Sequence, residues 1–77
     1  MERNVLLANR IKELCKEKNM TYQMVAEKGC MPVERVYRLY NGMVSNPGVF
    51  TMINLCDGLG ITLDEFFSTE EFKEFEG

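Results

Sequence analysis

The chain has 77 residues, of which 45% are hydrophobic and 27% charged, and its formal net charge at pH 7 is −3. This length and composition are ordinary for one small globular domain, and they exclude a second domain and general disorder. The longest apolar run, Val5-Leu6-Leu7-Ala8, is far shorter than the roughly 20 residues that span a bilayer. We therefore expect a cytoplasmic protein without a membrane partner.

The chain also lacks the side chains of most catalytic and metal sites. It has no histidine, and its three cysteines, Cys15, Cys30 and Cys56, are widely spaced and odd in number. This pattern does not indicate a zinc site or a disulfide framework. Without a histidine, or a serine or cysteine beside a plausible base, the usual groups for acyl transfer or metal-assisted hydrolysis are missing. We expect no enzymatic activity and no cofactor, and no small-molecule ligand is evident.

Charge is unevenly distributed along the chain. Residues 1–56 hold eight basic and five acidic side chains, whereas residues 57–77 hold one lysine and seven acidic side chains. The first three-quarters of the chain is therefore mildly basic, and the acidity belongs to the C-terminal end. The negative net charge does not by itself exclude a nucleic-acid partner, whose phosphates are bound by local basic groups.

The first element is an amphipathic helix. Leu7, Ile11 and Leu14 recur at the spacing of one helical face, over a face rich in charged residues. This spacing predicts a helix over residues 4–18. Asn4 is a suitable N-cap at its start.

Polar residues and a glycine bound a second, shorter helix. Asn19 is a suitable left-handed stop for the first helix, and Thr21 is a suitable N-cap for a helix that continues to about Lys28. A left-handed backbone costs a residue other than glycine about 1 to 2 kcal/mol. We therefore expect the turn after this helix to place Gly29, rather than Cys30, in the left-handed conformation.

A third helix follows this turn closely. Pro32 fits the entry of a helix because its missing N–H costs nothing there, and Asn41-Gly42 forms a typical stop. The third helix is therefore predicted over residues 32–40, so that residues 21–40 form two short helices joined by a tight turn. The outward side chains of this segment suit contacts with base edges and phosphates.

A fourth helix follows the loop over residues 43–47, which contains an Asn-Pro turn signal. Apolar residues repeat at helical spacing beyond this loop, and Gly60 closes the pattern: Val49, Met52, Ile53, Cys56 and Leu59. Neither strand alternation nor an internal repeat appears. The fold is therefore expected to be all-α, with short connections.

Two capping boxes mark the C-terminal end. Thr62–Glu65 opens a short fifth helix that contains Phe66 and Phe67, and Ser68–Glu71 precedes a last helical turn or two. We divide the chain into a domain over residues 1–67 and an acidic tail over residues 68–77. In the tail, Phe72 and Phe75 either form a dimer contact or pack back on the first helix.

Several ordered segments together resemble one family. These segments are Arg10–Leu14, Thr21-Tyr22, Val25–Lys28, Val36–Gly42, Asn46-Pro47 and Leu55–Phe67. Their order and spacing resemble the lambda-repressor and Cro-like helix-turn-helix family, also called the xenobiotic-response-element family. The resemblance covers about residues 5–67 and implies a compact five-helix bundle, followed here by a short helical tail.

The resemblance also implies a function. It identifies the chain as similar to sequence-specific regulators, most often repressors, that bind double-stranded DNA as homodimers. The third helix would lie in the major groove, with its N-terminal residues at base edges. The DNA-contacting positions implied in this way are Val33, Glu34, Arg35, Tyr37 and Arg38 for reading, and Thr21, Tyr22, Gln23 and Asn41 for backbone anchoring. Pro32, at the entry of the third helix, is a further candidate for DNA contact.

The loop after the third helix departs from the family pattern. The family commonly carries lysines there, but this chain has Met43, Val44 and Ser45, and Phe50 stands where a polar side chain is usual. Met43, Val44 and Phe50, together with Phe72 and Phe75, are candidates for a surface that binds a protein partner. The alternative function is therefore a protein-interaction module on the same fold, with weakened or lost DNA binding.

The basic side chains of the third helix also have two interpretations. Arg35 and Arg38 either contact DNA or remain solvated, with Glu34 and Arg38 forming an ordinary pair within the helix. DNA binding requires a basic surface beside the N-terminus of the third helix. Lys28 and at least one of Arg10 and Lys12 should contribute to that surface.

Overall fold

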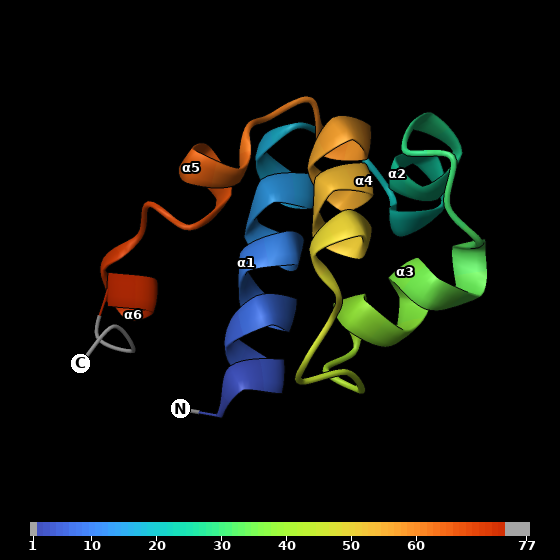
Figure 1. Ribbon diagram of the computed structural model, residues 1–77. Helices are drawn as coiled ribbons and strands as arrows, with labels where there is room; N and C mark the ends of the chain where they lie inside the picture. Colours follow the sequence, from blue (N-terminus) through green and yellow to red (C-terminus); the bar gives the residue numbers. More distant parts are fainter. Residues whose placement is uncertain (1, 74–77) are drawn as a thin grey trace.

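The computed structural model describes residues 2–73, and these form six helices joined by short turns (Figure 1). The helices are α1 (Arg3–Glu17), α2 (Tyr22–Lys28), α3 (Val33–Tyr40), α4 (Val49–Leu59), α5 (Leu63–Phe66) and α6 (Glu70–Lys73). The predicted all-α fold and the order of its helices are thus confirmed. Among residues 2–73, no helix has both the length and the apolar character needed to cross a membrane.

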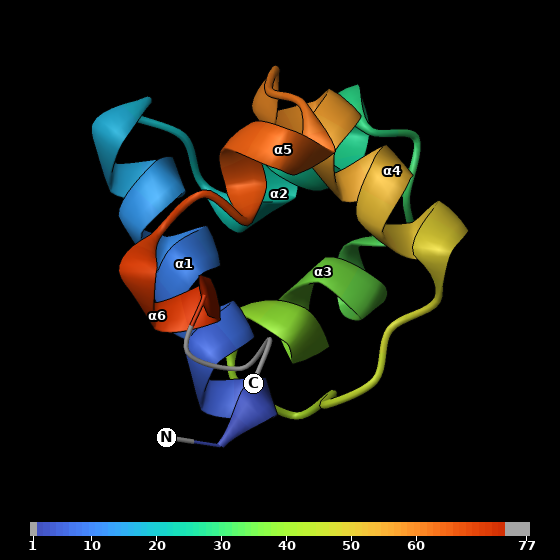
Figure 2. The same cartoon turned by 60° about the vertical axis from the view of Figure 1, so that its left-hand side comes forward.

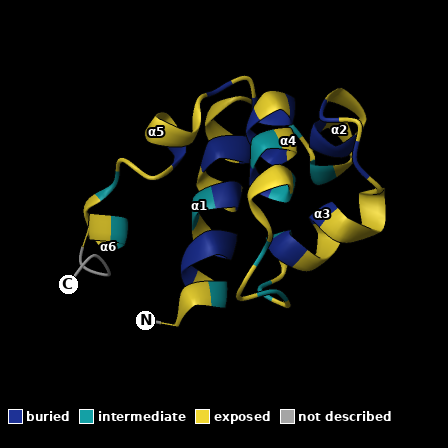
Figure 3. Ribbon diagram, viewed as in Figure 1, coloured by how far each residue is buried: buried dark blue, intermediate teal, exposed yellow. Residues whose placement is uncertain are grey.

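The helices surround one core. α3 packs against α1 and α2, while α4 packs against α2 and α5. In Figure 2, α1 and α4 stand on opposite sides of the core, with α5 between them at one end and α3 nearer the other. Each of the first five helices contributes a side chain with no exposed surface: Ile11, Val25, Val36, Leu55 and Phe66. Figure 3 shows that the buried positions face this common interior.

Two predicted helix caps are confirmed by their hydrogen bonds. The hydroxyl oxygen of Thr21 accepts a 3.2 Å bond from the backbone N–H of Met24, and the hydroxyl of Thr62 accepts a 3.1 Å bond from the N–H of Glu65. Each bond satisfies a donor that the first turn of a helix leaves free. Asn19 adopts the predicted left-handed conformation after α1, with φ at 55°.

The predicted role of Asn4 is wrong. Asn4 lies inside α1, and the N-cap residue is Glu2, whose side chain makes no capping bond. The amide of Asn4 instead donates a 2.7 Å hydrogen bond to the carbonyl of Gly42. This contact joins residues 38 positions apart, so no local signal near Asn4 announces it.

The turn between α2 and α3 also differs from the prediction. Cys30 takes the left-handed conformation, with φ at 54°, while Gly29 has φ at −89°. A Cβ atom on Gly29 would lie 2.4 Å from the carbonyl oxygen of Asn54, and one on Gly58 would lie 2.3 Å from that of Val25. Glycine is therefore required at Gly29 and Gly58, where α2 and α4 approach each other closely. Cys30, which follows Gly29, takes the left-handed conformation of the turn.

The C-terminal end is helical, but its second capping box is not used as predicted. The hydroxyl of Ser68 donates to the carbonyl of Glu65 at 2.8 Å, so Ser68 satisfies the end of α5 instead of starting α6. Phe67 is the C-cap of α5 rather than part of it. Phe72 is half-buried against the domain's own aromatic residues, with ring centroids 5.9 Å from Phe66 and 4.9 Å from Phe67. Phe75 lies outside the described residues.

Candidate functional site

α3 has one narrow buried face and a wide exposed one. Val36 and Leu39 are buried in the core, which fixes the rotation of the helix. The predicted reading residues all fall on the other side and are exposed: Val33, Glu34, Arg35, Tyr37 and Arg38. Pro32, the N-cap of α3, is also exposed. Val33 and Tyr37 keep 47% and 45% of their surface exposed, although both are large hydrophobic side chains. These side chains are therefore available to an external partner.

The two arginines of α3 differ in their electrostatic surroundings. Arg38 Nη2 lies 3.1 Å from Glu34 Oε1 in an exposed pair one helical turn apart. Such a pair stabilises a helix by only a few tenths of a kcal/mol, so a stronger acceptor can displace it. Arg35 is exposed and makes no ion pair with any residue in the described range 2–73. Arg35 thus carries the uncompensated positive charge of α3.

An aromatic cluster fixes α3 against α2. The ring centroid of Tyr22, the first residue of α2, lies 5.6 Å from that of Tyr37 and 5.5 Å from that of Tyr40. Tyr22 is half-buried against the core, so it positions α3 in addition to any contact of its own hydroxyl. The Nζ atom of Lys12 lies 5.4 Å from the centroid of the Tyr40 ring. This cation–π contact adds a positive charge from α1 to the edge of the α2–α3 pair.

Arg10 does not contribute to this surface. Its Nε donates to the carbonyl of Phe66 at 2.8 Å, and its Nη2 donates to the carbonyl of Glu65 at 2.7 Å. It also pairs with Glu13, and only 10% of its side chain is exposed. Of the two α1 cations considered from the sequence, Arg10 therefore joins α1 to α5, whereas Lys12 lies beside α3.

The anchoring candidates surround the two ends of the helix pair. Thr21 and Gln23 are exposed at the start of α2, and Asn41 is exposed after α3. The Nδ2 of Asn41 donates a 2.8 Å bond to the carbonyl of Tyr37, which leaves its Oδ1 free. The Thr21 hydroxyl accepts a bond from Met24 and can still donate its own hydrogen. These groups retain hydrogen-bonding capacity toward solvent.

The apolar residues after α3 point in different directions. Met43 and Phe50 are 65% and 80% exposed, whereas Val44 is half-buried against the core. Val44 lines a hollow of about 390 Å³ along α3, together with Arg35 and Arg38. Met43 lines a separate hollow beside the start of α1.

The thiols and carboxylates form no cluster of metal ligands in the described part of the chain. Within residues 2–73, no three cysteine or acidic side chains come together as metal ligands. Burial raises the pKa of Cys15, and burial together with the charge of Asp57 raises the pKa of Cys56 to about 11. Both thiols are therefore protonated at neutral pH and serve as small core side chains.

Comparison with known proteins agrees with this geometry. Residues 11–66 match a family model described as helix-turn-helix. No curated protein and no solved structure matches the chain. The matched range begins at the fully buried Ile11 of α1 and ends at the fully buried Phe66 of α5, so it includes the whole α2–turn–α3 unit and the residues that support it.

Proposed function

The helix-turn-helix family model matches residues 11–66, which are most of the chain, so the chain belongs to the lambda-repressor and Cro-like helix-turn-helix family, and we propose that it is a sequence-specific transcriptional repressor. The family binds double-stranded DNA and is not an enzyme family, so the chain is a DNA-binding regulator in general terms. The repressor role and the mode of reading are our proposal. The assignment to the xenobiotic-response-element family, which the sequence resemblance gives as another name of this family, is also part of our proposal and is supported by the ordered segments from Arg10 to Phe67.

The observation that carries the proposal is the exposed face of α3, on which the charge of Arg35 has no ion-pair partner among residues 2–73. We propose that α3 enters the major groove with its N-terminal half at the base edges. Arg35 would donate two hydrogen bonds to guanine, the commonest specific contact of arginine. Val33, one turn from Tyr37, is suited to the methyl group of thymine. Arg38 would exchange its exposed bond to Glu34 for a phosphate or base contact.

The remaining candidate residues would position the duplex. The hydroxyl of Thr21, the amides of Gln23 and Asn41, and the hydroxyl of Tyr37 are all exposed polar groups around the reading face. Such groups bind phosphate oxygens and set the register of the helix without reading the sequence. Lys12, at the edge of this face, would add phosphate attraction that the apolar loop after α3 does not provide.

We further propose that the protein binds as a homodimer. A single α3 reads only a few base pairs, whereas two copies related by a two-fold axis read two half-sites about 34 Å apart. A measured mass by light scattering at micromolar concentration tests this part separately. A strict monomer on its selected duplex would contradict it.

The test of DNA reading starts with selection of bound duplexes from a random pool. Arg35→Ala should then weaken binding to the selected site by roughly ten- to a hundredfold and relax the preference at one base position. Lys73→Ala is the matched control, because Lys73 lies in α6, across α1 from α3 (Figure 1). No enriched sequence, or equal affinities for Arg35→Ala and the parent protein, would contradict the proposal.

A second candidate function rests on the exposure of Phe50 and Met43. Apolar side chains this exposed after the reading helix suit a protein partner. In this alternative the chain is a protein-interaction module whose DNA binding is weak. It is favoured if selection enriches no duplex and if residual DNA binding is unchanged in both Arg35→Ala and Arg38→Ala.

A further inference from the structure

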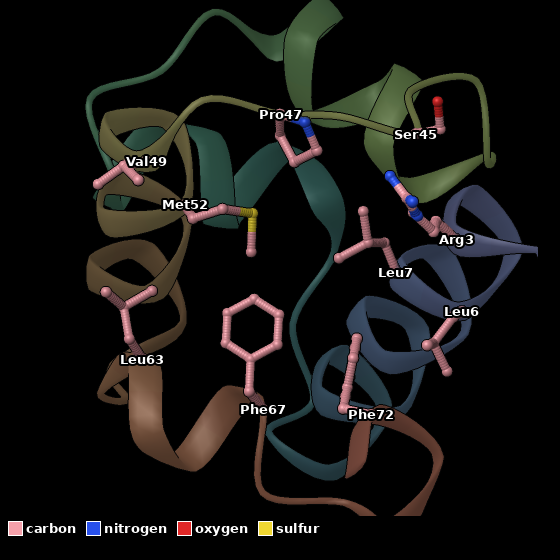
Figure 4. A pocket seen from close by; sticks show the side chains of 10 residues that line it. All are labelled: Arg3, Leu6, Leu7, Ser45, Pro47, Val49, Met52, Leu63, Phe67 and Phe72. Carbon is pink, nitrogen blue, oxygen red and sulfur yellow. The ribbon is translucent and has the colours of Figure 1, made fainter. Parts of the chain in front are cut away.

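A cleft of about 480 Å³ lies between α1, the loop over residues 45–47 and helices α4 to α6 (Figure 4). No residue of α2 or α3 lines it, so it is distinct from the proposed reading face. In Figure 4, Met52 and Phe67 border one side of the space, and Leu7 and Phe72 border the other. Its volume lies within the range of roughly 300 to 1,000 Å³ that is usual for small-molecule sites.

Most of the lining of the cleft is apolar, both at its floor and at its rim. Of the ten described residues that line it, eight are apolar. Leu6, Leu7 and Met52 are buried and form the floor. At the rim, Val49 and Phe67 keep 67% and 39% of their surface exposed. Apolar side chains left exposed around a concave surface are typical of sites that bind an apolar ligand group.

The polar groups of the cleft gather at one end. Among the described residues they are the guanidinium of Arg3 and the hydroxyl of Ser45, and no acidic side chain within residues 2–73 lines the cleft. Arg3 makes no ion pair within the described residues. Arg3 and Ser45 also line an adjoining hollow, and Glu2 lines that hollow but not the cleft. In Figure 4, the side chain of Arg3 extends into the space beside Ser45. The described part of the cleft therefore combines an apolar chamber with the cation of Arg3, which has no ion-pair partner among residues 2–73.

We propose that this cleft binds a small amphipathic carboxylate. Its carboxylate would accept two parallel hydrogen bonds from Arg3, and its apolar chain would lie between Met52, Phe67 and Phe72. Charge complementarity selects this class of ligand, because one carboxylate matches the guanidinium of Arg3 and the other described lining residues, apart from Ser45, are apolar. The binding site does not depend on the proposed function.

Decanoate below its micelle concentration is a suitable probe, with the whole chain observed by methyl NMR. We expect saturable shifts at the methyl groups of Leu6, Leu7, Met52 and Leu63, and no shifts at Val36. Decanol, which has the same chain without the charge, should perturb the same methyl groups. These shifts report the site directly.

Variants separate a specific site from general apolar binding. Arg3→Gln should weaken decanoate binding about tenfold and leave decanol binding unchanged, since a charge-assisted bond is lost. Lys16→Gln, on the same helix but not lining the cleft, is the matched control and should bind both probes as the parent does. Val49→Glu, at the exposed start of α4, should weaken decanoate through like-charge repulsion.

Three outcomes would overturn the proposal. One is a response to decanoate that does not saturate. Another is equal decanoate affinity in Arg3→Gln and the parent protein. The third is that the same methyl groups shift on dilution while decanoate has no effect, which would assign the cleft to a second copy of the chain.

Discussion

The side-chain amide of Asn4, in the first turn of α1, donates a 2.7 Å hydrogen bond to the carbonyl of Gly42, directly after α3. Gly42 has φ at 72°, and a Cβ added to it would lie 3.6 Å from the backbone oxygen of Asn4. The N-terminal turn of α1 therefore holds the end of α3 by a hydrogen bond, and only the positive φ of Gly42, not lack of space, favours glycine there. This contact fixes the helix that we propose to read DNA.

Removal of this bond should destabilise the fold. Asn4→Ala leaves the partly buried carbonyl of Gly42 without its donor, and we expect the free energy of unfolding to fall by about 1 to 2 kcal/mol. Asn54→Ala, at an exposed position of α4, should change it by less than about 0.5 kcal/mol. Chemical denaturation followed by circular dichroism measures both. Equal stability in the two variants would contradict the assigned role of Asn4.

The two glycines between α2 and α4 should tolerate no side chain. A Cβ on Gly58 would lie 2.3 Å from the carbonyl oxygen of Val25, a backbone atom that cannot move without shifting α2. We expect Gly58→Ala and Gly29→Ala each to lower the free energy of unfolding by about 3 kcal/mol or more, or to prevent folding. Gly48→Ala is the control, because nothing lies within 4 Å of its added Cβ. It should cost under about 1 kcal/mol, and a cost equal to that of Gly58→Ala would refute the argument.

These contacts explain which parts of the fold were predictable. Helix positions follow from side-chain spacing, and the caps Thr21 and Thr62 act on N–H groups three residues away. Asn4 and Cys30 were assigned wrongly because their conformations depend on residues far along the chain. The amide of Asn4 bonds to a residue 38 positions away, and Gly29 cannot take the turn's role while it packs against Asn54.

The candidate site was predictable to a similar degree. The buried spacing of Val36 and Leu39 sets the rotation of α3, so the exposure of Arg35 follows from the sequence. The different locations of the Arg10 and Lys12 side chains do not follow from the sequence, because both residues belong to the polar face of one helix. Arg10 donates hydrogen bonds to carbonyls 55 and 56 positions along the chain and so does not lie beside α3, whereas Lys12 contacts the Tyr40 ring.

Arg10 should therefore contribute to stability rather than to DNA affinity. Arg10→Met removes the donors that hold the carbonyls of Glu65 and Phe66, and we expect the free energy of unfolding to fall by about 2 to 3 kcal/mol. Lys16→Met, an exposed position of the same helix, should change it by less than about 0.5 kcal/mol. Under conditions where both variants are folded, affinity for the selected duplex should differ little between them. A large loss of affinity confined to folded Arg10→Met would place Arg10 at the DNA instead.

The left-handed turn offers a stabilising substitution. Cys30 has φ at 54°, a conformation that costs a side chain with a Cβ about 1 kcal/mol or more. Cys30→Gly should therefore raise the free energy of unfolding by about 0.5 to 1 kcal/mol, despite the greater freedom of glycine in the unfolded chain. Asn19→Gly is the matched comparison at φ 55°, where the gain should be smaller because asparagine tolerates this region. A loss of stability in Cys30→Gly would contradict the strain assigned to this turn.

The buried thiol of Cys56 should make stability depend on alkaline pH. Burial and the nearby charge of Asp57 raise its pKa from the ordinary value of 9.0 to about 11. Between these two values the unfolded chain releases the thiol proton while the folded protein keeps it. The unfolded state then binds fewer protons, so the free energy of unfolding should fall as pH rises from 9 to 11.

Cys56→Ala removes this contribution, so its stability should fall less steeply over the same pH range than that of the parent protein. All other side chains are common to the two proteins, so their effects cancel in the difference between the two curves. Val25→Ala is the control: it creates a cavity in the core and lowers stability at every pH, but should keep the parent's slope. Denaturant titrations across the range measure all three curves. Parallel curves for the parent and Cys56→Ala would show that the thiol ionises equally well in the folded and unfolded states.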